Sequence, residues 1–265
     1  MTEDRKALSE RRNKLEWKHK CSLDWLKERQ HYLTASEIKK LLPITATGRN
    51  RTVSDMDRIK VMSSKMVTLT EDDCWSYGVA ARGHIMEPYA IATLNEILSD
   101  KGSGEHLYWW DDVLVKRQDR KIAFSPDAMD VPMAKDFKTP SAIAEIKSYG
   151  AEKHLTTAYT PKDKIEERWQ IATAMALYES IDHGYLVLFN PKMKMRRTFV
   201  IRFDRSDLEK EIEMILKVEE DWKEFIQSGP LTKRPVNEAI YSSRGGDEEY
   251  IIKLEEQKQR LNPVV

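Results

Sequence analysis

The chain has few cysteines and no long hydrophobic run, and these shortages exclude several classes of protein. Its 2 cysteines, Cys21 and Cys74, fall short of the four thiolates that an iron–sulfur cluster needs, and they are typical of reduced thiols. No run of about 18 apolar residues is present, and residues 1–20 are charged throughout. We therefore expect no membrane span and no secretory signal, and a cytoplasmic location.

An excess of one charge sign is also missing, because 44 basic residues balance 44 acidic ones. A protein that wraps DNA without regard to sequence normally carries a basic excess. Composition therefore gives no support for nucleic-acid binding, and any such function must rest on a site. The 265 residues, 40% of them apolar and 33% charged, favour one soluble α/β domain with tails.

The first half of the chain is expected to be largely helical. Short helices are predicted over Leu23–Arg29 and over Glu37–Leu41, the second capped by Ser36. Pro43–Ser54 is typical of a loop. Apolar residues then recur at helical spacing from Asp72 to Leu98, with a kink or a new helix start expected at Pro88.

The second half alternates predicted strands with helices. Strands are expected over Leu107–Lys116, Lys121–Phe124, Ile143–Ser148, Gly184–Asn190 and Arg197–Phe203, and helices over Pro161–Glu179 and Ser206–Ile226. A core domain over residues 1–228 is predicted, including a charged N-terminal arm over 1–20. Residues 229–265 are expected to form a tail that is partly helical or disordered.

Two short segments carry the chemistry, SPDAMD at 125–130 and AEIKS at 144–148. Strand side chains alternate between faces, so Glu145 and Lys147 project to one side and Ile146 faces the core. Asp127 follows a proline at a strand end, where its carboxylate can approach that of Glu145. Paired carboxylates bind hard cations such as Mg²⁺, and a nearby lysine can orient an attacking water. A surface ion pair between Glu145 and Lys147 explains these two segments equally well.

Six motifs in order extend this pattern over residues 22–227. They are WLKERQHYLTASEI (25–38), ARGHIMEPYA (81–90), SPDAMD, AEIK, ERWQIATAMAL (167–177) and FNPKMK (189–194). In this order they resemble the phage lambda-type exonucleases, also called YqaJ-like viral recombinases, of the PD-(D/E)xK nuclease superfamily. The resemblance implies a restriction-endonuclease-like fold, in which helices flank a central mixed β-sheet.

The resemblance also implies roles for individual residues. Glu87, Asp127, Glu145 and the backbone carbonyl of Ile146 would bind the metal, Lys147 would be the catalytic lysine, and Gln170 would lie beside the reactive centre. Arg29, Ser36 and Ser125 would hold a terminal 5′-phosphate, which suits a guanidinium and hydroxyl donors. Arg49 and Arg51 fall in a loop that would reach across the DNA. One departure is Ala172, where the family often has a second glutamine.

Several of these residues have simpler explanations when each is considered alone. Glu87 precedes Pro88 and suits a helix boundary, Gln170 is typical of an exposed helical position, and Ser36 suits a helix cap. Arg29 suits a solvated position on a short helix. The joint occurrence of the six motifs favours the site over these separate explanations.

The implied function is digestion of one strand of linear double-stranded DNA from its ends, 5′ to 3′, for single-strand-annealing recombination of phage DNA. Mg²⁺ would be the cofactor, with Mn²⁺ able to substitute. The implied setting is the bacterial host cytoplasm, and the implied assembly is a trimeric ring that works with a single-strand annealing protein. Three alternatives stay open: a structure-specific endonuclease of the same fold, a non-catalytic DNA-binding or assembly module, and a metal hydrolase acting on another substrate.

Overall fold

The computed structural model describes residues 18–45, 49–132 and 139–228. The chain divides into one unit over Met1–Glu224 and a second over Phe225–Val265. The predicted tail over 229–265 and most of the predicted arm over 1–20 lie outside the described residues. The boundary near residue 228 therefore stays a prediction.

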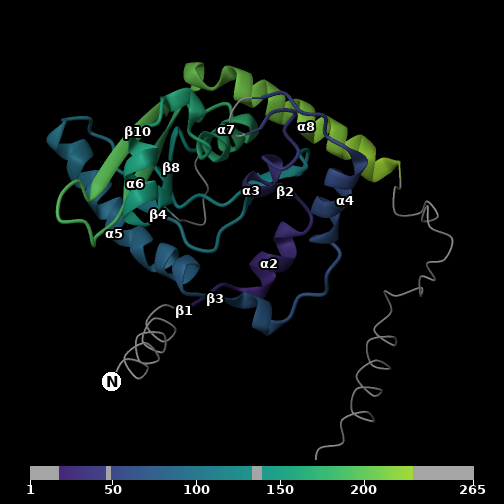
Figure 1. The fold of residues 1–265 in the computed structure, drawn as a ribbon, viewed down its shortest axis with the longest axis horizontal. Helices are drawn as coiled ribbons and strands as arrows, with labels where there is room; N and C mark the ends of the chain where they lie inside the picture. The colour runs from purple at the N-terminus through teal and green to yellow at the C-terminus, as the bar shows by residue number, and fades with distance from the viewer. Residues whose placement is uncertain (1–17, 46–48, 133–138, 229–265) are drawn as a thin grey trace, which may run out of the picture. The chain divides into compact units, whose positions relative to one another are not determined.

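A five-stranded mixed sheet carries the segments that were singled out in the sequence (Figure 1). Its strand order is β10 (Thr198–Asp204), β9 (His183–Phe189), β8 (Ala142–Lys147), β7 (Ala128–Met129) and β4 (Tyr108–Trp109). Strand β8 pairs with β9 in parallel, and the other neighbours are antiparallel. The register sets Lys147 opposite Leu188, so both strands end at the same edge of the sheet.

Two helices cover opposite faces of this sheet. Helix α5 (Val79–Asp100) packs Ala90, Ile91 and Leu94 against a face that includes Ala144 and Ile146 of β8. Helix α7 (Arg168–Leu177), which is almost wholly buried, packs against the face formed by the alternate residues of β8. The prediction that Ile146 faces the core while Glu145 and Lys147 share the other side is confirmed.

A glycine sets how closely α7 approaches the sheet. A Cβ atom on Gly184 of β9 would lie 2.5 Å from Cγ2 of Ile171 on α7 and 3.3 Å from Cγ1 of Ile143 on β8. Real Cβ contacts are longer than the first of these distances, so a side chain at this position would push the helix outward. Gly184 therefore lets α7 lie directly on the strands.

A second sheet has the order β2 (Leu33–Thr34), β6 (Ile122–Phe124) and β5 (Val115–Lys116), and a third pairs β1 (Lys18–Lys20) with β3 (Trp75–Tyr77). The remaining helices are α2 (Leu23–Arg29), α3 (Ala35–Ile38), α4 (Asp55–Ser63), α6 (Ala151–Ala158) and α8 (Glu209–Gln227). Short 3-10 turns cover Glu71–Cys74, Lys162–Lys164 and Arg205–Asp207. Among the described residues, no helix combines the length and the apolar character that a membrane span requires.

Several predicted boundaries are wrong in the helical first half. Helix α3 begins at Ala35, because Glu37 accepts hydrogen bonds from Thr34 N (2.9 Å) and Thr34 Oγ1 (2.7 Å); Ser36 lies inside the helix and does not cap it. The helix predicted from Asp72 begins only at Val79, since Gly78 has a φ of 63° and is not in a helical conformation. No new helix starts at Pro88, which lies within α5.

Other predicted elements are divided or shifted. The strand expected over Leu107–Lys116 is two strands in different sheets, separated by Asp112, whose φ is 48°. The helix expected over Pro161–Glu179 begins only at Arg168. Helices α4 and α6 were not predicted. In contrast, the bounds of α2 match the prediction, and β8, β9 and β10 match it to within one residue at each end.

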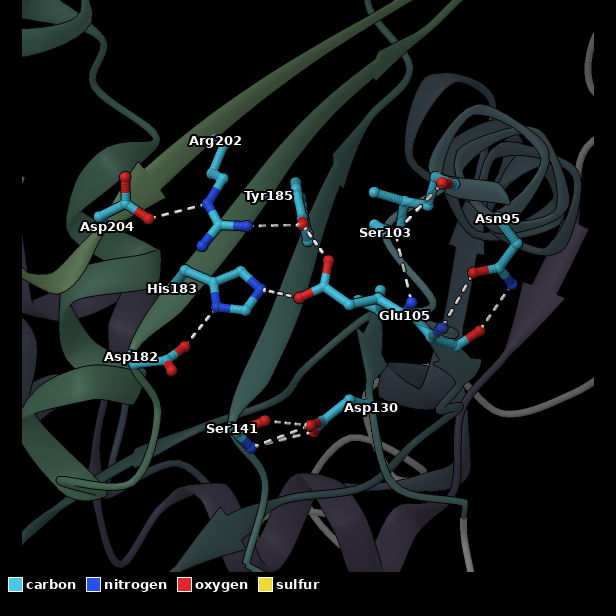
Figure 2. A network of polar contacts seen from close by, with 12 residues as sticks. Asn95, Ser103, Glu105, Asp130, Ser141, Asp182, His183, Tyr185, Arg202 and Asp204 are labelled. Carbon is cyan, nitrogen blue, oxygen red and sulfur yellow. Dashed lines mark hydrogen bonds and ion pairs between the residues drawn. The ribbon is translucent and has the colours of Figure 1, made fainter. Parts of the chain in front are cut away.

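A polar network lies at the end of the five-stranded sheet where β8 and β9 begin (Figure 2). His183, the first residue of β9, lies between two carboxylates: Nε2 is 2.7 Å from Glu105 Oε1, and Nδ1 contacts Asp182. The hydroxyl of Tyr185 also contacts Glu105 and accepts a 3.3 Å hydrogen bond from Arg202. These contacts join β9 and β10 to the segment that precedes β4, at the edge where β8 and β9 begin.

Candidate active site

Asp127 and strand β8 are joined by a direct hydrogen bond. Asp127 directly precedes β7, which pairs with β8 so that Ala128 lies opposite Ala144. Its Oδ2 accepts a 2.6 Å hydrogen bond from the backbone N–H of Ile146. The carboxylate is thereby held beside Ile146, the residue between Glu145 and Lys147. The role predicted for the Ile146 carbonyl in metal binding stays a prediction.

Glu145 lies at the centre of the polar contacts. Its side chain is only 9% exposed, and Oε1 accepts a 2.7 Å hydrogen bond from Nε2 of Gln170 and also contacts Nζ of Lys147. Gln170 comes from α7, so two elements far apart in the sequence meet at one carboxylate oxygen. The simpler explanation of Gln170 as an exposed helical residue is wrong, because its amide faces this buried group.

Glu87 reaches the same region from helix α5. Its residue is 8% exposed, and Oε1 lies 3.1 Å from Nδ1 of His84, one turn earlier on the same helix. This contact raises the pKa of His84 above its usual range, against the effect of burial. Glu87 is also near enough to Asp127 to influence its ionisation, so the three predicted carboxylates form one electrostatic group.

Burial and mutual repulsion govern the charges in this group. Burial raises the pKa of Asp127 well above its usual range, and the negative charges of Glu145 and Glu87 raise it further. Burial alone would lower the pKa of Lys147, but Glu145 and Asp127 outweigh it and hold that pKa above its usual range. Three carboxylates face one ammonium here, and a divalent cation would offset the excess negative charge.

The donor set fits a hard cation in chemistry, since carboxylate oxygens are the ligands that Mg²⁺ and Mn²⁺ prefer. In the described parts of the chain, however, no three His, Cys, Asp or Glu side chains are placed so that they could hold a metal ion as they stand. At Glu145, Oε1 already contacts Lys147 and accepts a hydrogen bond from Gln170. A cation would therefore need these side chains to rotate.

Three further polar residues border the site and were missed from the sequence. Nη2 of Arg82 donates a 2.8 Å hydrogen bond to the carbonyl of Ser148, directly after β8, while its buried Nε has no partner among the described residues. The hydroxyl of Tyr149 contacts the buried carboxylate of Glu167. Arg82 and Glu167 both lie within the motif segments, but only the fold shows that they face the end of β8.

The residues predicted to hold a 5′-phosphate cluster around the second sheet. Strands β2 and β6 run in parallel with Thr34 opposite Ala123. Ser36 and Ser125 each follow one of these two residues along the chain, so both lie beyond the same end of the strand pair. Oγ of Ser36 lies 3.2 Å from Oγ1 of Thr34. Oγ of Ser125 is buried and has no hydrogen-bond partner within the described ranges, so its hydrogen-bonding capacity is unused there.

Arg29 has the environment of a half-buried cation, not of a solvated one. Its guanidinium carbon lies 4.3 Å from the centre of the Trp25 ring. Burial lowers the pKa of Arg29, and the nearby carboxylate of Glu37 opposes that effect. Glu37 in turn contacts Thr34, so Arg29 belongs to the same neighbourhood as Ser36. The explanation of Arg29 as a fully solvated charge is therefore wrong.

The two loop arginines have different surroundings. Nε of Arg51 donates a 2.7 Å hydrogen bond to the carbonyl of Leu42, and its Nη2 contacts the carbonyl of Lys40. Arg49 is exposed, and its backbone pairs with Thr45. Residues 46–48, which precede Arg49 in this loop, lie outside the described residues. Arg51 therefore stabilises the loop, whereas the Arg49 side chain extends from it.

The mixed sheet between α5 and α7 places the chain in the restriction-endonuclease-like α/β fold class, as predicted. The solved structures that resemble it include an alkaline exonuclease (LHK-Exo) from Laribacter hongkongensis. The match has a TM-score of 0.51 and 16% sequence identity, and it covers 78% of this chain and 97% of that chain. LHK-Exo in complex with dAMP matches over the same shares with a TM-score of 0.49. No protein-family model and no curated protein matches the sequence.

Proposed function

We propose that this chain is a metal-dependent deoxyribonuclease that digests one strand of linear double-stranded DNA from its ends in the 5′-to-3′ direction. The observation that supports it most is the convergence of Glu87, Asp127, Glu145, Lys147 and Gln170 from separate elements of the fold. The fold shared with an alkaline exonuclease agrees with this proposal. The combination of carboxylates with a lysine suits phosphodiester hydrolysis better than a surface ion pair, because Glu145 is buried.

Glu87, Asp127 and Glu145 would hold Mg²⁺, or Mn²⁺ in its place. A bound divalent cation supplies polarisation of the scissile phosphate and a more acidic attacking water. Lys147 presents an ammonium beside Glu145, where it can offset charge on the phosphate or orient the water. Gln170 holds the Glu145 carboxylate in position through Oε1. Arg29, Ser36 and Ser125 would bind the terminal 5′-phosphate and so direct the enzyme to DNA ends.

Assembly and partners form a finer part of the proposal, supported by the family resemblance. The chain would form a trimeric ring around DNA in the host cytoplasm and supply single strands to an annealing protein, in recombination of phage DNA. A closed ring needs cations only on its lining, which agrees with the balanced charge of the chain. Light scattering coupled to gel filtration tests this assembly, and a mass of one chain would contradict it.

The test of the activity is digestion of linear duplex DNA labelled at its 5′ or 3′ end, with a covalently closed circle as the control substrate. The wild type and Lys147→Ala are compared in Mg²⁺ and in EDTA, with Lys101→Ala as a matched variant at an exposed lysine. We expect linear DNA to shorten from phosphorylated 5′ ends while circles survive. EDTA and Lys147→Ala should each abolish cutting, and Lys101→Ala should not.

Two other outcomes distinguish the alternatives. Cutting of circles would retain the metal site but indicate an endonuclease of the same fold. An absence of cutting, together with an absence of Mn²⁺ binding in calorimetry, would indicate a non-catalytic DNA-binding or assembly module.

A further inference from the structure

The turn between β9 and β10 carries a concentration of positive charge in a chain whose charges balance overall. We call residues Asn190–Arg197 (NPKMKMRR) the basic hairpin. It contains Lys192, Lys194, Arg196 and Arg197 and no acidic residue, and the next acid along the chain is Asp204. Cations gathered on one surface are the usual electrostatic mark of polyanion binding.

The basic hairpin lies at the edge of the sheet where the candidate active site is found. Strand β9 runs parallel to β8 with Leu188 opposite Lys147, so β9 leaves the sheet at the same edge. Nδ2 of Asn190 then donates a 2.9 Å hydrogen bond to the carbonyl of Tyr149, two residues beyond Lys147. The hairpin is thus fixed directly to the segment that follows the catalytic strand.

Backbone contacts hold the hairpin in one conformation. The N–H of Asn190 donates to the carbonyl of Arg197 at 2.8 Å, and Oδ1 of Asn190 accepts from the N–H of Lys192 at 3.1 Å. Nε2 of the buried His154 on α6 lies 3.0 Å from the carbonyl of Arg196. Arg196 has φ of 56°, a left-handed conformation that is costly for a residue with a side chain. Such a conformation persists where the surroundings determine it.

All four cations are exposed, and within the described ranges none of them forms an ion pair. The guanidinium carbon of Arg196 lies 5.8 Å from the centre of the Tyr159 ring. Arg197 differs, because its Nε donates to the carbonyl of Met193 at 2.8 Å and so supports the turn. Since no carboxylate of the described residues neutralises Lys192, Lys194 and Arg196, these three charges are available to an external anion.

We infer that the basic hairpin binds the phosphate backbone of duplex DNA next to the bond that is cut. The inference rests on the proposed function, because a phosphodiester at Lys147 would bring neighbouring phosphates to this edge of the sheet. Point charges on lysine recognise phosphate without reading base edges, so the contact contributes affinity and not sequence preference. An acidic protein surface is the competing partner, and the test separates the two.

The test compares the salt dependence of duplex binding in EDTA for the wild type and for Lys192→Gln/Lys194→Gln/Arg196→Gln. The matched control is Lys101→Gln/Lys121→Gln/Lys210→Gln, which removes three exposed charges from other elements. The slope of log affinity against log salt should fall by about 1 for each cation that no longer neutralises a phosphate. We expect a decrease of about 3 for the hairpin variant and about 0 for the control variant. Lys192→Arg/Lys194→Arg should keep the wild-type slope, because it keeps both charges.

The result that overturns the inference is a hairpin variant with the wild-type slope and a wild-type melting temperature. If that variant also failed to bind an acidic protein that the wild type binds, the hairpin would be assigned to a protein partner. The proposed function fails separately, when the wild type cuts no DNA in Mg²⁺. If the wild type digests linear DNA but the hairpin variant binds duplex as tightly as the wild type, only the hairpin inference is contradicted.

Discussion

Gln170 on helix α7 and Glu145 on strand β8 are joined by a 2.7 Å hydrogen bond from Nε2 to Oε1, in the same group of contacts that includes Lys147. The bond depends on how closely the helix approaches the sheet. That approach is possible because Gly184 of β9 presents no side chain to Ile171, the residue after Gln170. A backbone feature of one strand thereby positions a side chain at the candidate active site.

Removal of the Gln170 amide should impair catalysis without unfolding the protein. In Gln170→Ala, Oε1 of Glu145 keeps its contact with Lys147 but loses the amide donor from α7. Partners of this kind typically contribute about 10- to 100-fold to activity or metal affinity. We expect digestion of linear duplex to slow by that range, measured at saturating DNA across a Mg²⁺ titration. Gln118→Ala, at an exposed position, is the control; equal rates for the two variants would contradict the prediction.

A methyl group at Gly184 should destabilise the fold. The Cβ atom of Gly184→Ala would lie 2.5 Å from Ile171 Cγ2, so α7 must shift away from the sheet. Overpacking of this kind costs about 1–3 kcal/mol. Urea unfolding followed by circular dichroism measures it. Gly83→Ala, in helix α5 with nothing within 4 Å of the new Cβ atom, should be neutral or stabilising. A Gly184→Ala chain as stable as wild type would argue against this packing.

Ser125→Ala should reduce the preference for phosphorylated ends. Oγ of Ser125 is buried without a protein partner among the described residues, so its removal leaves no group newly unsatisfied. Hydrogen bonds to charged groups are worth about 1.5–3 kcal/mol, or roughly a 10-fold effect or more. Competition between 5′-phosphate and 5′-hydroxyl duplexes measures the preference. An exposed-site variant, Ser99→Ala, should keep the wild-type ratio, and an unchanged ratio in Ser125→Ala would remove Ser125 from the phosphate pocket.

Glu219 should make stability depend on acid pH. Glu219 is 2% exposed, and its carboxylate accepts hydrogen bonds from Arg120 Nε at 2.8 Å and from Lys121 N at 2.5 Å. These partners lower the pKa of Glu219, although burial alone would raise it. A lowered folded pKa contributes stability that is present above the unfolded pKa of about 4.5 and is lost as pH falls through the folded pKa. Glu219→Gln should therefore cost about 3 kcal/mol at pH 7 and progressively less in acid.

The measurement is the free energy of unfolding of both chains from neutral pH into the acid range below the unfolded pKa of glutamate. Glu220→Gln, on the exposed side of α8, controls for the removal of one negative charge. A gap between wild type and Glu219→Gln that stays constant over the whole range would show that ionisation of Glu219 does not contribute.

The sequence by itself determined the local parts of this protein. The segment Ile143–Ser148 predicts a strand with Glu145 and Lys147 on one side, and the structure has that strand over Ala142–Lys147. Strand alternation depends only on neighbouring residues, so periodicity suffices to find it. The bounds of α2 follow from equally local signals, such as the cap at Ser22, whose Oγ accepts a 3.0 Å hydrogen bond from Trp25 N.

Only the tertiary structure decided which side chains meet. The segment over Leu107–Lys116 has the composition of one strand, yet its two ends join different sheets. The sequence does not show that Arg51 bonds to the carbonyl of Leu42, and Arg82 gains a role only because α5 passes the end of β8. The bond between Gln170 and Glu145 crosses 25 residues and depends on Gly184. Such contacts arise from packing between distant segments, which local propensity and periodicity do not encode.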